Sequence, residues 1–83
     1  NWIYFLVMKL GDWVDNMGLP CMVAHICIGD VRVVLVDING KKHYQDKGTL
    51  QLCSKPIGLT PFAETLIFLR CLALRTKYLN QLL

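Results

Sequence analysis

The sequence has few charged residues for its size. Only 18% of its 83 residues are charged, whereas 54% are hydrophobic. The length suits one domain, and a domain this small buries roughly 60% of the surface that its unfolded chain exposes. This much apolar sequence cannot all be hidden. We therefore expect some apolar surface to be left for a partner chain.

A long uninterrupted apolar segment is also lacking. The apolar stretch over residues 2–8 ends at Lys9, whereas a helix that crosses a bilayer needs about 20 apolar residues. No basic residue precedes this stretch, as one would in a signal peptide. We expect no membrane contact. Because the chain begins with Asn1, we also expect it to be a fragment of a longer protein.

Metal-ligand spacing is absent. No two cysteines stand in a C-x2-C pair, and neither histidine supplies an H-x3-H partner, so we expect no metal and no cofactor. Each cysteine lies in an apolar run, which favours buried free thiols and a reducing, intracellular compartment. The cysteines are Cys21, Cys27, Cys53 and Cys71.

Catalytic patterns are missing too. If residues 21–28 form a strand, Cys21 and His25 share one face but lie about 13 Å apart, beyond hydrogen-bond reach. Asp37 precedes Asn39 and Gly40, and a carboxylate in that position typically accepts backbone hydrogen bonds at a turn. A phosphate-binding loop is not found. We predict that the chain is not an enzyme.

What the sequence does contain is a series of short strands. Val33 and Leu35 should share one face of the surest strand, with Val34 and Val36 on the other. The Asn-Gly pair at Asn39 is a strong hairpin signal. Strands are expected at residues 1–8, 21–28, 31–36, 41–44 and 49–53, residues 13–16 could add a short further strand, and residues 54–59 form a linker. The pattern predicts a mainly β fold, a small SH3-like barrel of five strands over residues 1–59, followed by an α-helix.

The helix is expected over residues 60–83. Thr60 can cap it, Pro61 suits its first position, and Glu64 lies near the positive end of its dipole. Two sets of apolar residues share this segment, so one barrel is too small to cover both. Phe62, Leu66, Leu69 and Ala73 form one stripe, and the set expected to bind a partner chain or a second copy is Ile67, Phe68, Cys71 and Leu74. Periodicity leaves a strand at residues 66–72 as an alternative.

Basic residues are scattered along the chain, which carries a net charge of +3. Nucleic-acid binders usually gather such residues on one face, so we expect ordinary solubilising charge here and do not expect nucleic acid as a partner. The alternative is a nucleic-acid-binding small barrel of Sm or chromatin type. In that case phosphate contacts would come from Lys41, Lys42, Lys47 and Lys55.

Several short motifs follow one another in a recognisable order. Leu10-Gly11-Asp12 precedes the strands at residues 21–26 and 31–37, Ile38-Asn39-Gly40 forms the turn after them, and Pro61-Phe62-Ala63 begins the helix. Over residues 10–65 this order resembles the extended Tudor domains of germline and small-RNA proteins. In that family the third strand reads Val-x-Val-x-Phe-Val-Asp, and Tyr-Gly-Asn stands at the position of Ile38-Asn39-Gly40.

The resemblance implies a protein-docking scaffold in cytoplasmic or perinuclear granules of small-RNA (piRNA) silencing. Tudor domains that read methylated arginine use aromatic rings and one Asn, because the rings attract the guanidinium. The positions that match this cage are Asn16 (or Met17), Met22, Leu35, Ile38 and Gly40, and none is aromatic. We therefore predict a degenerate Tudor domain that docks protein without reading methylarginine.

Overall fold

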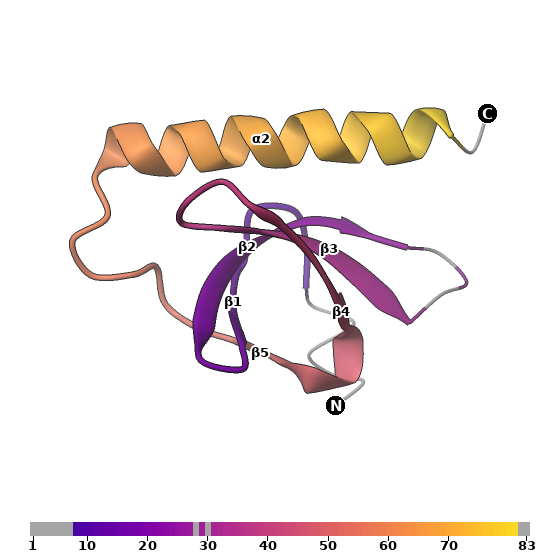
Figure 1. Ribbon diagram of the computed structural model, residues 1–83, viewed down its shortest axis with the longest axis horizontal. Coiled ribbons are helices and arrows are strands. Elements are labelled where there is room, and N and C mark those ends of the chain that lie inside the picture. The colour runs from indigo at the N-terminus through magenta and orange to yellow at the C-terminus, as the bar shows by residue number, and fades with distance from the viewer. Residues whose placement is uncertain (1–7, 28, 30, 82–83) are drawn as a thin grey trace.

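The computed structural model describes residues 8–27, 29 and 31–81. Residues 1–7 of the predicted first strand lie outside this part of the chain. The strands are β1 (Trp13–Asn16), β2 (Leu19–Ile26), β3 (Arg32–Asp37), β4 (Lys42–Asp46) and β5 (Leu50–Leu52), as Figure 1 shows. A 3-10 turn, η1 (Lys47–Thr49), joins β4 to β5, and the helix is α2 (Pro61–Asn80).

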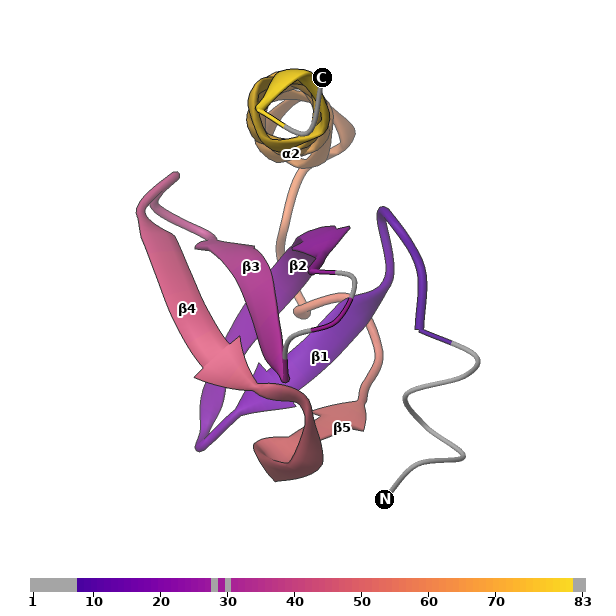
Figure 2. The ribbon, with the colours of Figure 1, turned by 90° about the vertical axis from the view of Figure 1, so that its right-hand side faces the viewer.

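The five strands form one antiparallel sheet in the order β4-β3-β2-β1-β5. The predicted class is confirmed: the part of the chain that the structure describes is mainly β, with five strands and a C-terminal α-helix. The sheet is bent but open, and β4 and β5 are its two edges (Figure 2). The side chain of Gln45 on β4 reaches across the opening, where its Nε2 donates to Asn16 Oδ1 on β1 at 2.9 Å. Within the described residues the barrel is therefore bridged by side chains and η1, not closed by strand pairing.

Both faces of β3 are buried, each in a different core. Val33 and Leu35 face the inside of the bent sheet, whereas Val34 and Val36 face α2, as the alternation predicted. The inner core contains Met8, Val14, Cys21, Val23, Val33, Leu35 and Leu50. The helix-side core contains Trp13, Met22, Ala24, Val34, Val36, Ile67, Cys71 and Leu74.

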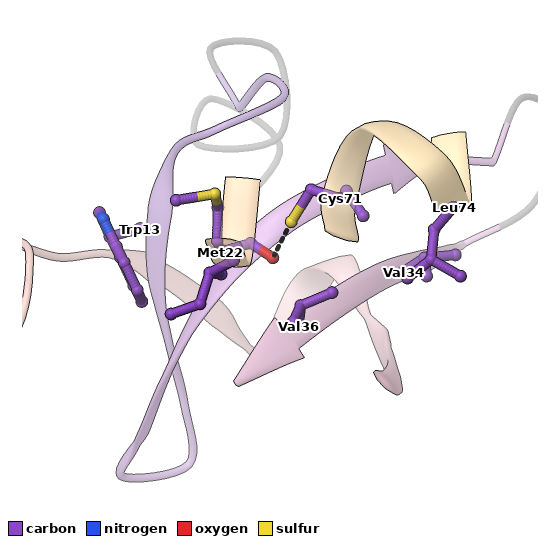
Figure 3. Close-up of a cluster of buried hydrophobic side chains, with 8 residues drawn as sticks. Trp13, Met22, Val34, Val36, Cys71 and Leu74 are labelled. Carbon is purple, nitrogen blue, oxygen red and sulfur yellow. Dashed lines mark hydrogen bonds between the residues drawn. The ribbon is translucent and has the colours of Figure 1, made fainter. Parts of the chain in front are cut away.

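The helix lies across one side of the sheet as a separate layer (Figures 1 and 2). Its inner face inserts Ile67, Cys71 and Leu74 into the helix-side core, as Figure 3 shows for the last two. The Cys71 thiol donates to the backbone oxygen of Met22 at 3.8 Å. A small residue at position 71 thus lets α2 approach the backbone of β2 closely.

The start of α2 follows the sequence signals. Thr60 Oγ1 accepts a hydrogen bond from the Ala63 amide at 3.1 Å. Pro61 occupies the first turn, where a missing N–H costs nothing. A continuous helix over residues 61–80 rules out the alternative strand at residues 66–72.

One irregularity in β2 changes the direction of a side chain. Val23 pairs with Leu35 and His25 with Val34, so the register shifts by one residue between Val23 and His25. This bulge turns His25 toward α2, where its ring stacks on Tyr78 at a centroid distance of 5.6 Å. Cys21 stays in the inner core. The expectation that Cys21 and His25 share a face is wrong, because a bulge breaks the period of two.

Candidate docking surface

An apolar stripe runs along the outer face of α2. Phe62 is 73% exposed, Leu66 51% and Leu69 53%, and exposed Ala73 continues the line. The residues are spaced four, three and four apart, which places them on one side of a helix. We call Phe62, Leu66, Leu69 and Ala73 the outer stripe. Large apolar side chains in water at this spacing are typical of a helix face that binds another chain.

The prediction that the free face carries Ile67, Phe68, Cys71 and Leu74 is wrong. Ile67, Cys71 and Leu74 are at most 4% exposed, and half-buried Phe68 packs against the same core. The ring of Phe68 lies so close to Gly11 that a Cβ there would stand 3.3 Å from it. These four residues hold the helix on its own sheet, and the outer stripe is the face left free.

A groove adjoins the outer stripe at the β3–β4 hairpin. It has a volume of about 190 Å³ and lies between Ile38, Asn39 and Gly40 of the turn and Ala63, Leu66 and Ile67 of α2. Ile38 is 44% exposed and Leu66 51% exposed, so both walls of the groove present apolar surface to water. The groove widens the apolar surface from a single helix face to a two-sided cleft.

The hairpin beside this groove is fixed by Asp37. Its carboxylate accepts hydrogen bonds from the amides of Asn39 at 2.8 Å and Lys41 at 3.0 Å, and it contacts His43 Nε2 at 2.7 Å. Burial opposes ionisation, but the bonds from His43 and the two amides outweigh it and lower the pKa of Asp37. The predicted role as a turn acceptor is confirmed. All of these bonds hold Ile38 and Gly40 in place.

The charges near the groove are basic. Arg70 and Lys77 are exposed on α2, four and eleven residues after Leu66, which places both on the hairpin side of the helix. Lys41 is exposed on the turn, and Lys42 Nζ lies 5.1 Å from the Tyr44 ring centre. We call Lys41, Lys42, Arg70 and Lys77 the basic flank.

The four lysines of the nucleic-acid alternative do not gather on one surface. Lys41 and Lys42 lie at the hairpin next to α2, whereas Lys47 begins η1 at the other end of β4 (Figure 1). Lys55 belongs to the linker and pairs with Glu64 at 3.5 Å. The structure therefore gives this set no common phosphate-binding face.

The opposite flank of α2 carries carboxylates. A hollow of about 400 Å³ is lined by Asp12, Glu64, Met22 and Phe68, among others. Asp12 pairs with Lys9 at 3.3 Å and Glu64 with Lys55 at 3.5 Å. Because both carboxylates already have cationic partners, the charges that line this hollow are balanced, in contrast to the basic flank.

A ring cluster lies at the C-terminal end of α2. His25 stacks on Tyr78, and the Tyr78 hydroxyl is hydrogen-bonded to that of Tyr44 on β4. Burial and then the charge of Arg75 lower the pKa of His25, whose Nδ1 is buried without a hydrogen-bond partner. The cluster fastens the end of the helix to the sheet, with the imidazole held in its neutral form.

The residues that match the aromatic cage do not form one site. Met22 lies in the helix-side core and Leu35 in the inner core, on opposite faces of the sheet. Asn16 is tied to Gln45, while Ile38 and Gly40 line the groove. Met22 and Leu35 lie on opposite faces because side chains alternate along each strand. Leu35 pairs with Val23, the neighbour of Met22, and Met22 pairs with Val36. Only Ile38 and Gly40 therefore belong to the candidate docking surface.

The cysteines differ from one another in exposure. Cys21 and Cys71 are buried, Cys27 is half-buried and Cys53 is exposed, and all four are free. The expectation of four buried thiols is wrong for Cys53, which follows the edge strand β5, and Cys27 meets it only in part. Within residues 8–27, 29 and 31–81, no three His, Cys, Asp or Glu side chains gather into a metal-binding group. None of the helices in that same part is long and apolar enough for a bilayer.

Searches against protein-family models, curated proteins and solved structures found no match to this chain.

Proposed function

We propose that the chain is a non-catalytic protein-docking module, a Tudor-type sheet without an aromatic cage, and that it binds its partner through the outer stripe of α2. The observation that carries the proposal is the exposure of Phe62, Leu66 and Leu69 on a helix whose other face is fully used. Complete burial of a large apolar side chain contributes roughly 1.5–3 kcal/mol, and these three side chains are 51–73% exposed, so about half of that free energy or more is still to be gained at each. A partner helix or sheet would recover part of this free energy.

The Tudor part of the proposal is supported by the order of signals over residues 10–65 and by the mainly β fold with its C-terminal helix. The same resemblance supports a scaffold role in cytoplasmic or perinuclear granules of small-RNA silencing. A second copy of the chain is the alternative occupant of the outer stripe.

Comparative affinity capture tests this function. The bait is the chain as wild type, as Leu69→Glu in the outer stripe, or as Ile57→Glu on the linker, where the side chain is fully exposed and lies off α2. Both substitutions replace an exposed apolar side chain with one negative charge, so both variants should fold. We expect proteins retained by wild type and by Ile57→Glu to be lost with Leu69→Glu. Identical capture by all three baits would contradict docking through the stripe.

A further inference from the structure

We propose that the partner segment is an acidic amphipathic α-helix, whose apolar side chains cover the outer stripe and enter the groove while its carboxylates face the basic flank. This inference rests on the proposed function and names the chemistry of the partner. It combines two observations, the two-sided apolar cleft at Ile38 and Leu66 and the charge on one side of it.

The shape of the surface suits a helix. The outer stripe follows α2, which has 20 residues and is about 30 Å long at 1.5 Å per residue. Beside its N-terminal half, the hairpin turn forms a second wall, and the groove of about 190 Å³ has room for a side chain of leucine size. A partner helix that lies along this cleft would place residues at i, i+3, i+4 and i+7 against the stripe.

The charge next to the cleft selects an acidic partner. Arg70 and Lys77 continue the flank of α2 that faces the hairpin, and Lys77 is close enough to Tyr44 to lower the pKa of its hydroxyl, after the larger effects of Tyr78 and Lys42. Lys41 extends the positive surface onto the turn. The carboxylate of Asp37 nearby is buried and held by its own turn. Glutamates along one edge of a partner helix would therefore meet several cations and no exposed acid of the hairpin turn at residues 37–41.

A second copy of the chain meets this surface less well. The only acidic residue of α2 is Glu64, in its first turn, and that carboxylate pairs with Lys55. Two α2 helices packed through their outer stripes would bring Arg70 of each copy near the same apolar seam without a carboxylate to accept it. Like charges in such a position oppose association.

Fluorescence anisotropy with two designed peptides tests this inference. Both peptides are helices of about 21 residues, matched to the length of α2, with leucines at the heptad a and d positions. One carries glutamates at the e and g positions and the other carries lysines. We expect the glutamate peptide to bind wild type with a Kd below about 100 μM, and the lysine peptide to bind at least about tenfold more weakly. The preference should shrink as the salt concentration rises past about 0.15 M.

Matched variants locate the binding site. Leu66→Ser removes an apolar wall of the groove, and Ile57→Ser removes a fully exposed apolar side chain on the linker, away from the groove. Arg70→Gln removes one positive charge from the basic flank. Its control, Lys55→Gln, removes one positive charge on the opposite side, where Lys55 pairs with Glu64. Leu66→Ser and Arg70→Gln should weaken binding of the glutamate peptide, the latter about two- to fivefold, and the two controls should not.

Four results would overturn the acidic helix. The first is equal or tighter binding of the lysine peptide, and the second is no binding of either peptide. The third is tighter binding of a single-stranded RNA oligonucleotide that competes with the glutamate peptide. The fourth is a stable dimer in sedimentation that Leu66→Ser dissociates. If capture still depends on Leu69 after such a result, the docking function stands and only the partner chemistry is wrong. If capture is independent of Leu69 as well, both proposals fall.

Discussion

Leu69 and Cys71 lie two residues apart on α2 and point in nearly opposite directions: Leu69 is 53% exposed, and Cys71 is fully buried against β2. Two residues advance an α-helix by 200°, so this pair separates its outer stripe from its inner face. The difference explains how one helix can anchor a sheet and still offer an apolar surface.

Aspartate substitutions at these two positions should differ sharply in stability. Leu69→Asp leaves the charge in water and should change the free energy of unfolding by no more than about 0.5 kcal/mol. Cys71→Asp buries an unpaired charge in the helix-side core, which should cost at least about 3 kcal/mol and detach α2. Urea unfolding followed by circular dichroism measures both. Equal destabilisation by the two variants would show that the assignment of the helix faces is wrong.

The thiols should react in two groups. Exposed Cys53 should react first with a thiol reagent, followed by half-buried Cys27. Burial raises the pKa of Cys21 to about 11 and that of Cys71 to about 12, so neither forms thiolate readily at neutral pH. Cys21 and Cys71 should therefore react only on unfolding. A Cys53→Ser variant should lose the fastest phase, and retention of that phase would contradict the assignment.

Stability should fall as the pH is lowered past the ordinary pKa of histidine. Burial and Arg75 lower the pKa of His25 below 6.5, so the unfolded chain binds a proton more readily than the folded one. The stabilising contribution is complete above about pH 6.5 and is lost as the pH falls through the lowered pKa. The urea midpoint should drop between about pH 7.5 and pH 5. The drop should be smaller in His25→Phe, whose ring can still stack on Tyr78. An equal drop in this variant would show that protonation of His25 does not cause the loss of stability.

Methylated arginine should not bind. The positions that resemble an aromatic cage lack aromatic rings, and Met22 and Leu35 are buried on opposite faces of the sheet. Without rings, no quadrupole attracts the guanidinium. Calorimetry with a symmetrically dimethylated Arg-Gly peptide should detect no binding. A dissociation constant below about 100 μM, equivalent to roughly −5.5 kcal/mol, would be incompatible with a degenerate cage.

The features that the sequence predicted well depend on local patterns. Alternation placed Val33 and Val34 on opposite faces of β3, the Asn-Gly pair at Asn39 marked the hairpin, and Thr60 marked the start of α2. Each of these signals acts through neighbouring residues. They needed no knowledge of what the element packs against.

The features that the sequence missed depend on tertiary packing. Two apolar stripes share α2, and hydrophobicity alone does not say which one meets the sheet. In the structure the stripe that meets the sheet is the one with Cys71, whose thiol donates to the backbone oxygen of Met22. The bulge that turns His25 toward Tyr78 has no glycine to signal it. The basic flank was missed because Lys41 and Arg70 are far apart in the chain.

Site-specific photo-crosslinking in cells tests docking through α2 most directly. A photoreactive phenylalanine analogue is placed at Leu69 in the outer stripe or, as a control, at Ile57 on the linker, where the side chain is also exposed. We expect a discrete crosslinked protein partner from position 69 that is absent from position 57. The same crosslinked products from both positions, or none from position 69, would contradict docking through α2.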